Sequence, residues 1–310
     1  FMLKTPTITR PKTIDDLLNT QLIAKLDPLD LSSKRVFFGK LKGERRSKKR
    51  GQSVEFADHR PYTSGDDIRH IDWNIYARLD TLFLKLFLEE EDLSLHVVID
   101  CSASSDTGDP NKFLFMQRAA AAMGYIGLVN LNRVTMTAMG ERDDGSGIAG
   151  TLRDLRGRRR LHDLASFLCS LEPKGAFSFR NAAERIALSR RGKGVMLVFS
   201  DFFFKDGFEE GLRRLVGHGY DVFCIQVLSP QEIEPPITGD LRLRDVEDND
   251  AAEVTVSAPL LKRYKANLAA YCKSLEQFCT QRDMQLLTVR SDTPVDTLVL
   301  DYLRRKGVVK

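Results

Sequence analysis

Cysteine is scarce in this chain, and long apolar runs are absent from it. The five cysteines among 310 residues form no Cys-x-x-Cys pair, and most of them lie in apolar stretches. This usage argues against a disulfide framework or a zinc ribbon and is typical of a reducing compartment. No apolar run approaches the roughly 20 residues of a membrane-spanning helix, and no signal peptide is visible. We therefore expect a cytoplasmic protein with no membrane partner.

Motifs of several enzyme classes are missing as well. The sequence contains no P-loop, so we expect no ATP hydrolysis by the chain itself, and it contains no Gly-x-Ser-x-Gly nucleophile elbow. Residues 145–150 match the dinucleotide pattern Gly-x-Gly-x-x-Gly, but a polar and basic stretch follows them instead of an apolar helix. A hairpin turn before an edge strand is the better interpretation of these glycines.

Charge is nearly balanced overall but locally uneven. The formal net charge is only +4, which does not by itself predict a nucleic-acid partner. Residues 34–50 nevertheless carry nine basic groups, opposed only by Glu44, and no aromatic residue interleaves with the last of them. A solvated loop is at least as plausible as a phosphate-contacting surface. Nucleic-acid binding through residues 34–50 is therefore kept only as an alternative, and we do not expect a nucleic acid to be the partner.

The order of apolar segments predicts two regions. From residue 94 onward apolar strands alternate with helices, which is typical of a doubly wound α/β sheet. The strands are expected at 94–100, 133–139, 195–200, 221–228 and 285–289. Asp109 is expected to cap the helix that follows the first strand, with Pro110 at its first position. Residues 1–92 predict a small α+β region that packs on this core, with a helix from Ile14, a short strand at 54–56, a loop over 60–67 and a strand at 82–88. Residues 93–310 form the second region, with an inserted hairpin near 231–257.

A dense group of charged residues surrounds the single tryptophan, Trp73. We interpret it as an ion-pair network that holds the N-terminal region against the core. Its members are Arg60, Asp66, Asp67, Arg69, His70, Asp72 and Arg78.

An acid and two hydroxyls follow the strand at 94–100, in the order Asp100, Ser102 and Ser104. The carboxyl ends of parallel strands border the crevice where open α/β sheets bind ligands. Carboxylate and hydroxyl oxygens suit Mg²⁺ or Mn²⁺. Taken alone, these three residues are equally consistent with a cap of the following helix.

A second strand ends in the same way, in Ser200 and Asp201. If the two strands are neighbours, Asp201 faces Asp100 across the crevice. Two close carboxylates repel each other unless a cation or a proton lies between them. The pair therefore favours a shared metal over a helix cap.

Together these motifs resemble the metal-ion-dependent adhesion site of von Willebrand factor A domains, a likeness that covers about residues 94–300. The residues ahead of them resemble the domain-of-unknown-function 58 (DUF58) family, through Glu55-Phe56, Arg60-x-Tyr62, Gly65-Asp66, Arg69, Ile71-Asp72-Trp73, Ala77-Arg78 and Glu90. The resemblance implies a von Willebrand factor A-like, Rossmann-type α/β fold, with a mostly parallel sheet between helices and one antiparallel edge strand. It also implies a prokaryotic protein without established catalytic activity, typically encoded beside a MoxR-type AAA+ ATPase.

One position departs from the adhesion-site pattern. Phe177 stands where those domains carry a threonine ligand in a second loop. Phenylalanine cannot ligate a metal, and Ser178 is a weak substitute that requires the loop to shift by one residue. Without it, we expect either weak metal binding or a site that is empty in the purified protein.

These residues predict binding rather than catalysis. We expect Asp100, Ser102 and Ser104 to hold Mg²⁺ or Mn²⁺, with Asp201 in direct or water-mediated contact, while an acidic partner side chain completes the coordination. The chain would then be an adaptor for a MoxR-type AAA+ ATPase in the assembly or maturation of protein complexes. The alternative is a metal-dependent phosphoryl or phosphodiester enzyme, for which Asp106 and Arg180 are candidates for the general base and the phosphate clamp.

Overall fold

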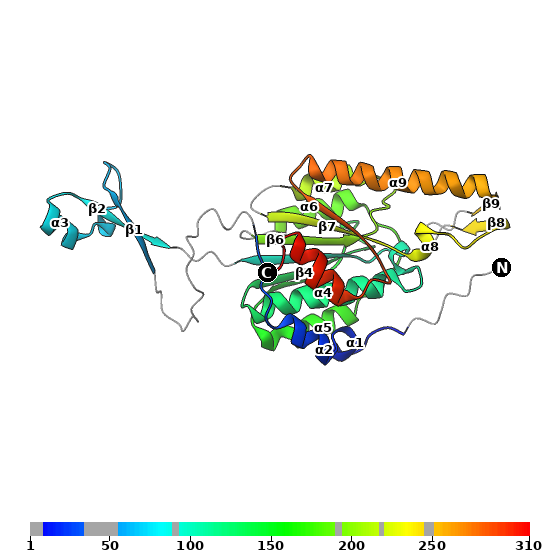
Figure 1. The fold of residues 1–310 in the computed structure, drawn as a ribbon, viewed down its shortest axis with the longest axis horizontal. Helices are drawn as coiled ribbons and strands as arrows, with labels where there is room; N and C mark the ends of the chain where they lie inside the picture. Colours follow the sequence, from blue (N-terminus) through cyan, green and yellow to red (C-terminus); the bar gives the residue numbers. More distant parts are fainter. Residues whose placement is uncertain (1–8, 34–54, 89–92, 190–193, 217–219, 245–250) are drawn as a thin grey trace. The chain divides into compact units, whose positions relative to one another are not determined.

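The chain divides into two compact units. The structure, a computed structural model, describes residues 9–33, 55–88, 93–189, 194–216, 220–244 and 251–310 (Figure 1). The larger unit contains residues 1–35 and 92–310, and the smaller one residues 36–91. The end of the smaller unit lies at the predicted boundary. The N-terminal segment differs from the prediction, because Leu17, Leu18 and Leu26 are buried in the larger unit.

A six-stranded sheet forms the centre of the larger unit. Its strands are β3 (Ser94–Asp100), β4 (Arg133–Met139), β5 (Ile148–Leu155), β6 (Gly194–Ser200), β7 (Tyr220–Leu228) and β10 (Gln285–Arg290). The spatial order is β10-β7-β6-β3-β4-β5, and only the edge strand β5 is antiparallel to its neighbour. This doubly wound order, with its antiparallel edge, confirms the predicted α/β class.

Strands β3 and β6 are neighbours at the point where the strand order reverses. Every residue of both strands is buried, as expected for a parallel strand covered on two faces. Ser94 pairs with Gly194 at one end of the two strands and Ile99 pairs with Phe199 at the other. A Cβ atom on Gly194 would lie 1.8 Å from the Ser94 carbonyl oxygen, so only glycine allows this approach. The register places Asp100 beside Ser200.

Helices cover both faces of the sheet (Figure 1). One layer contains α4 (Lys112–Val129) and α5 (Leu161–Cys169), with the short N-terminal helices α1 (Ile14–Leu17) and α2 (Thr20–Leu26) packed on them. The other contains α6 (Phe179–Ser189), α7 (Glu209–Leu215) and α9 (Ala258–Thr280). The short helices α8 (Pro230–Ile233) and α10 (Val295–Thr297) follow β7 and β10. The predicted hairpin is present as β8 (Gly239–Arg244) and β9 (Ala251–Val256).

Two helices differ from the prediction. The Asn111 side chain, not Asp109, caps α4 by accepting a hydrogen bond from Leu114 N at 3.0 Å. The backbone of Asp109 is instead held by the Gln231 side chain, at 3.0 Å and 2.6 Å. The N-terminal helix is interrupted near Asn19, whose side chain caps a new helix at Leu22 N. In both places an asparagine side chain caps a helix start that was not predicted.

The predicted turn between β4 and β5 is confirmed. Gly145 and Gly147 have φ values of +64° and +69°, and the Asp144 side chain accepts a hydrogen bond from Ser146 N at 2.9 Å. These are features of a tight turn, not of a phosphate-binding loop that opens a helix.

The smaller unit pairs β1 (Glu55–Pro61) with β2 (Phe83–Leu88), and α3 (Trp73–Leu79) lies between them in the sequence. β1 is longer than the predicted strand at 54–56, so the loop begins after Pro61. Asp72 caps α3 and also contacts His59 at 3.0 Å and Lys85 at 3.3 Å. The described ion pairs of the predicted charged group thus connect parts of the smaller unit. Most of the basic segment 34–50 belongs to this unit too, but it lies outside the described residues.

Candidate metal centre

The three predicted ligands after β3 converge. Asp100 is fully buried, and its Oδ1 accepts hydrogen bonds from Ser102 N at 2.9 Å and Ser102 Oγ at 2.7 Å. The hydroxyls of Ser102 and Ser104 lie 3.0 Å apart. The loop therefore gathers one carboxylate and two hydroxyls at one point, as the spacing of alternate residues predicts.

The end of β6 closes the second side of this group. Ser200 Oγ donates a hydrogen bond to Asp100 Oδ2 at 2.5 Å and accepts one from Phe202 N at 2.9 Å. Asp201 is also buried, and its Oδ1 accepts a hydrogen bond from Phe203 N at 3.0 Å. The two strand ends meet because β3 and β6 are paired, which is the arrangement that the proposed pairing of Asp100 with Asp201 required.

Asp100 is the electrostatically unsatisfied member of the group. Burial, reinforced by the negative charge of Asp201, raises the pKa of Asp100 to about 6 despite the hydrogen bonds from Ser200 and Ser102. None of the ion pairs among the described residues involves Asp100. A buried carboxylate in this condition favours a cation beside it, so the residues present fit a hard divalent metal.

Asp201 is in a different condition, because a buried lysine neutralises it. Lys112 Nζ lies 2.7 Å from Asp201 Oδ2 and 2.6 Å from Glu232 Oε1. The Lys112 side chain is 1% exposed, at the start of α4, where the structure brings it between β6 and α8. Burial acts to lower the pKa of Lys112, but the two carboxylates raise it above its ordinary value.

Sequence reasoning missed Lys112 and Glu232. One signal was available, since Lys112 and Arg118 are the only charged residues of an otherwise mostly apolar helix. A charge on such a helix requires a buried partner. The sequence does not say which carboxylate that is, because Asp201 is 89 residues away.

The second loop lies beside the first, where the resemblance predicts it. Ala103 N donates a hydrogen bond to Gly175 O at 2.9 Å, and Lys174 N donates one to Cys101 O at 3.1 Å. Ser178, the weak candidate ligand, donates its hydroxyl hydrogen to Asp206 Oδ2 at 2.9 Å. Ser178 thus lies next to the site, but its hydroxyl is bonded to Asp206, in the loop between β6 and α7.

Phe177 contributes an apolar wall in place of a ligand. Its ring packs edge-on against Phe204, with 5.7 Å between the ring centres. Both rings line a cavity of about 240 Å³, whose other lining residues are Ser102, Ala176, Ser178, Lys205 and Asp206. The cavity therefore adjoins the three-residue ligand group through Ser102.

The residues proposed for the alternative phosphoryl chemistry are not brought to this point together. Asp106 Oδ2 lies 2.6 Å from Arg10 Nη2, and its Oδ1 accepts a hydrogen bond from Asn111 Nδ2 at 3.0 Å. Arg180 is exposed on the first turn of α6. Across the described ranges, no three His, Cys, Asp or Glu side chains are grouped as a metal site, so any metal here relies on the serines.

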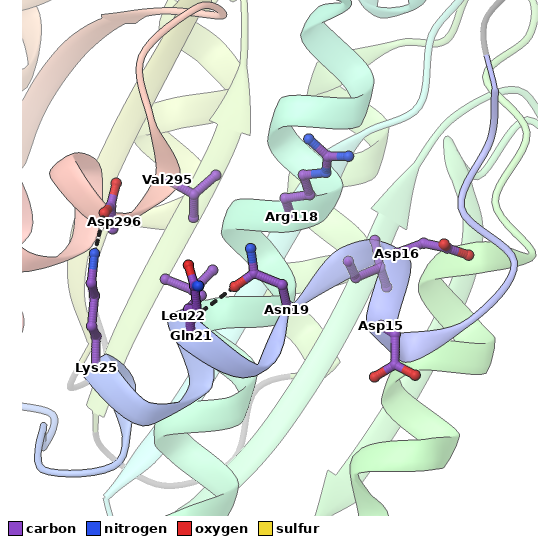
Figure 2. A pocket seen from close by; sticks show the side chains of 10 residues that line it. Asp15, Asp16, Asn19, Gln21, Leu22, Lys25, Arg118, Val295 and Asp296 are labelled. Atoms are coloured by element: carbon purple, nitrogen blue, oxygen red, sulfur yellow. Dashed lines mark hydrogen bonds and ion pairs between the residues drawn. The ribbon is translucent and has the colours of Figure 1, made fainter.

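A further cavity, of about 460 Å³, lies between the N-terminal helices, α4 and α10. Figure 2 shows Lys25 reaching Asp296, with 2.7 Å between Nζ and Oδ2, while Asn19 caps α2 and Arg118 projects from α4. None of the predicted ligands lines this cavity. It is a polar surface cleft apart from the candidate centre.

Among the described helices, none has both the length and the apolar character needed to cross a membrane.

Comparison with known proteins points to one family. The family model described as "Protein of unknown function DUF58" matches residues 58–273. "Uncharacterized protein Rv1480" of Mycobacterium tuberculosis and "Uncharacterized protein Mb1516" of Mycobacterium bovis are each 26% identical over 317 residues, covering 99% of this chain and 98% of their own. The family match includes residues of both units and all of the predicted ligands.

Solved structures resemble the chain more remotely. The conserved hypothetical protein BatB from Bacteroides thetaiotaomicron is 12% identical, with a TM-score of 0.41, over 69% of this chain and 98% of its own. A von Willebrand factor type A protein from Catenulispora acidiphila is 13% identical, with a TM-score of 0.32, over 60% of this chain and 43% of its own.

Proposed function

This chain belongs to the DUF58 family, and we propose that it is a non-catalytic module that binds a partner protein through a divalent cation. The observation that carries the proposal is the buried Asp100 carboxylate. It accepts hydrogen bonds from two serine hydroxyls, the charge of Asp201 acts on it, and it forms none of the described ion pairs. Such a group is costly to keep ionised unless a cation binds it.

The charges of the cluster support a divalent ion. When ionised, Asp100, Asp201 and Glu232 contribute three negative charges and Lys112 contributes one positive charge, which leaves two negative charges. Mg²⁺ or Mn²⁺ would neutralise this remainder. The oxygens of Asp100, Ser102 and Ser104 would hold the ion, and such ions commonly keep several water ligands.

Asp201 would contact that ion through water, because its Oδ2 is already held by Lys112. Ser178 would contribute only after leaving Asp206. The direct protein ligands are then few, which leaves positions open. The chemistry that a bound ion supplies is an exchangeable site for a carboxylate of the partner.

A binding role is favoured over phosphoryl transfer because the nearby acids already form hydrogen bonds or ion pairs with other side chains. Asp106 is held by Arg10 and Asn111, and Asp201 by Lys112. An acid held in this way is a poor general base, because the oxygens that would accept the proton are already bonded to other side chains. Binding through the basic segment 34–50 is tested separately, by its sensitivity to salt.

The partner that we propose is a MoxR-type AAA+ ATPase, or the protein complex on which it acts, in the cytoplasm of a prokaryote. The family resemblance supports this choice. In such a pair the ATPase supplies the energy of remodelling, and this chain acts as the adaptor that selects the target.

The direct test is calorimetry of Mg²⁺ and Mn²⁺ binding. We expect heat with the native chain, none with Asp100→Ala and a reduced affinity with Ser104→Ala. Asp143→Ala, an exposed acid in the turn before β5, is the matched control and should bind as the native chain does. No heat with the native protein would refute the metal centre. Pull-down of the ATPase with and without a chelator then tests the adaptor role, and binding that ignores the chelator would reject a metal bridge.

A further inference from the structure

The cavity beside the candidate metal centre suggests what the partner carries next to its carboxylate. Building on the proposed function, we propose that this cavity receives one apolar side chain of the partner. The recognised segment is then an acidic residue with a leucine-sized or methionine-sized residue beside it. Ser102 belongs to both sites, so the two partner side chains would lie within one short segment.

The walls of the cavity favour an apolar guest. Phe177, Phe204 and Ala176 contribute carbon atoms, while the polar groups of Ser178 and Asp206 are hydrogen-bonded to each other at 2.9 Å. Lys205 also lines the cavity, but it is exposed and its ammonium can stay in water. Ser102 is likewise bonded to Asp100 and Ser104. A polar guest would give up its bonds to water and find these groups already occupied, whereas an apolar guest gives up nothing.

The size of the cavity selects a side chain over a larger ligand. Its volume of about 240 Å³ falls below the roughly 300–1,000 Å³ of pockets that hold drug-sized molecules. The space therefore suits a single aliphatic side chain better than a cofactor or a secondary-structure element.

The aromatic wall is held in place before any guest arrives. Phe204 stacks on Phe179, with 4.2 Å between ring centres, and Phe179 is fully buried. Phe202, also buried, contacts both rings edge-on. A preformed wall needs little ordering on binding, which favours affinity.

Phe177 affects both the metal and the cavity. At the position where the adhesion-site pattern has a metal ligand, this chain has an aromatic ring that faces the cavity. Phenylalanine at this position, in place of threonine, lowers the affinity for the metal and adds apolar contact area. Recognition at this site would accordingly depend on both groups, and neither would suffice alone.

Defined peptides test the proposal on the full chain in Mg²⁺. The probes are acetyl-Gly-Asp-Leu-Gly-amide and acetyl-Gly-Leu-Asp-Gly-amide, in which the two central residues are exchanged. Each probe is compared with one version in which Leu is replaced by Gly and another in which Asp is replaced by Asn. Dissociation constants are measured by NMR titration of the peptides. We expect loss of Leu to weaken binding of the better probe about tenfold or more. Equal affinity with and without Leu, or no binding by any probe while Mg²⁺ binds, would overturn the proposal.

Two variants separate the cavity from the metal. Ala176→Leu, at the exposed rim, should fill the cavity and abolish the preference for Leu while Mg²⁺ affinity stays unchanged. Ala269→Leu, on the exposed surface of α9, is the matched control and should change neither. Phe177→Thr should tighten Mg²⁺ binding and reduce the preference for Leu. If the Leu preference survives a chelator, the cavity stands and the metal bridge fails. If Asp and Mg²⁺ matter but Ala176→Leu has no effect, the metal bridge stands and the cavity fails.

Discussion

Removing the ammonium of Lys112 should destabilise the larger unit severely. In Lys112→Met the side chain keeps its approximate length and apolar stem but loses its charge. Asp201, whose side chain is 3% exposed, then remains buried without the cation that lies 2.7 Å from it. Glu232 is 24% exposed, so water can solvate it after the change. The loss should therefore come mainly from Asp201.

The expected magnitude follows from the burial of the pair. Removing one partner of a buried ion pair typically costs about 3–5 kcal/mol, because an unpaired charge is left in the interior. Lys112 and Asp201 are both almost fully buried, so we expect a loss in this range. Asp201→Asn in the Lys112→Met background removes the stranded charge. The double variant should recover about 2 kcal/mol or more relative to the sum of the single changes.

The assay is urea unfolding followed by far-ultraviolet circular dichroism. The single tryptophan, Trp73, lies in the smaller unit, so its fluorescence would not report on Lys112. Lys265→Met is the matched control. Its side chain is 50% exposed and its ammonium lies 3.4 Å from Glu234, so the loss should be below about 1 kcal/mol. A loss equally small for Lys112→Met, or strict additivity with Asp201→Asn, would refute the reasoning.

Three further predictions concern metal binding, the central sheet and the smaller unit. Lys112→Met should bind Mg²⁺ more tightly than the native protein in calorimetry, because Asp201 is released; weaker binding would contradict the water-mediated role of Asp201. Gly194→Ala should unfold the larger unit at markedly lower urea, because its Cβ would lie 1.8 Å from the Ser94 carbonyl oxygen; a native-like midpoint would show that β3 and β6 can separate. The pKa of Asp72 is lowered from 3.8 to about 2, chiefly by its hydrogen bond with His59. The stability that Asp72 contributes to the smaller unit should be fully present above about pH 4 and lost as the pH falls through 2. Urea unfolding followed by Trp73 fluorescence at different pH values measures this loss. Asp72→Asn should make the stability of the smaller unit less dependent on pH in this range.

The sheet and the first loop were predictable because their signals are local. β3 and β4 have the predicted bounds, 94–100 and 133–139, since buried parallel strands are continuous apolar runs. The convergence of Asp100, Ser102 and Ser104 follows from alternate spacing at a strand end. The start of α4 was predicted wrongly, because Asp109 and Asn111 are both good caps and the choice depends on Gln231.

The sequence by itself determined the α/β class, the family and the places where acids leave the strands. Tertiary structure alone decided how those acids are neutralised. In the folded chain Asp100 forms no ion pair among the described residues, Lys112 is paired with Asp201, and Ser178 is hydrogen-bonded to Asp206. The physical reason is that apolar periodicity is read within one element. The partner of a buried charge is set by packing between elements that are distant along the chain.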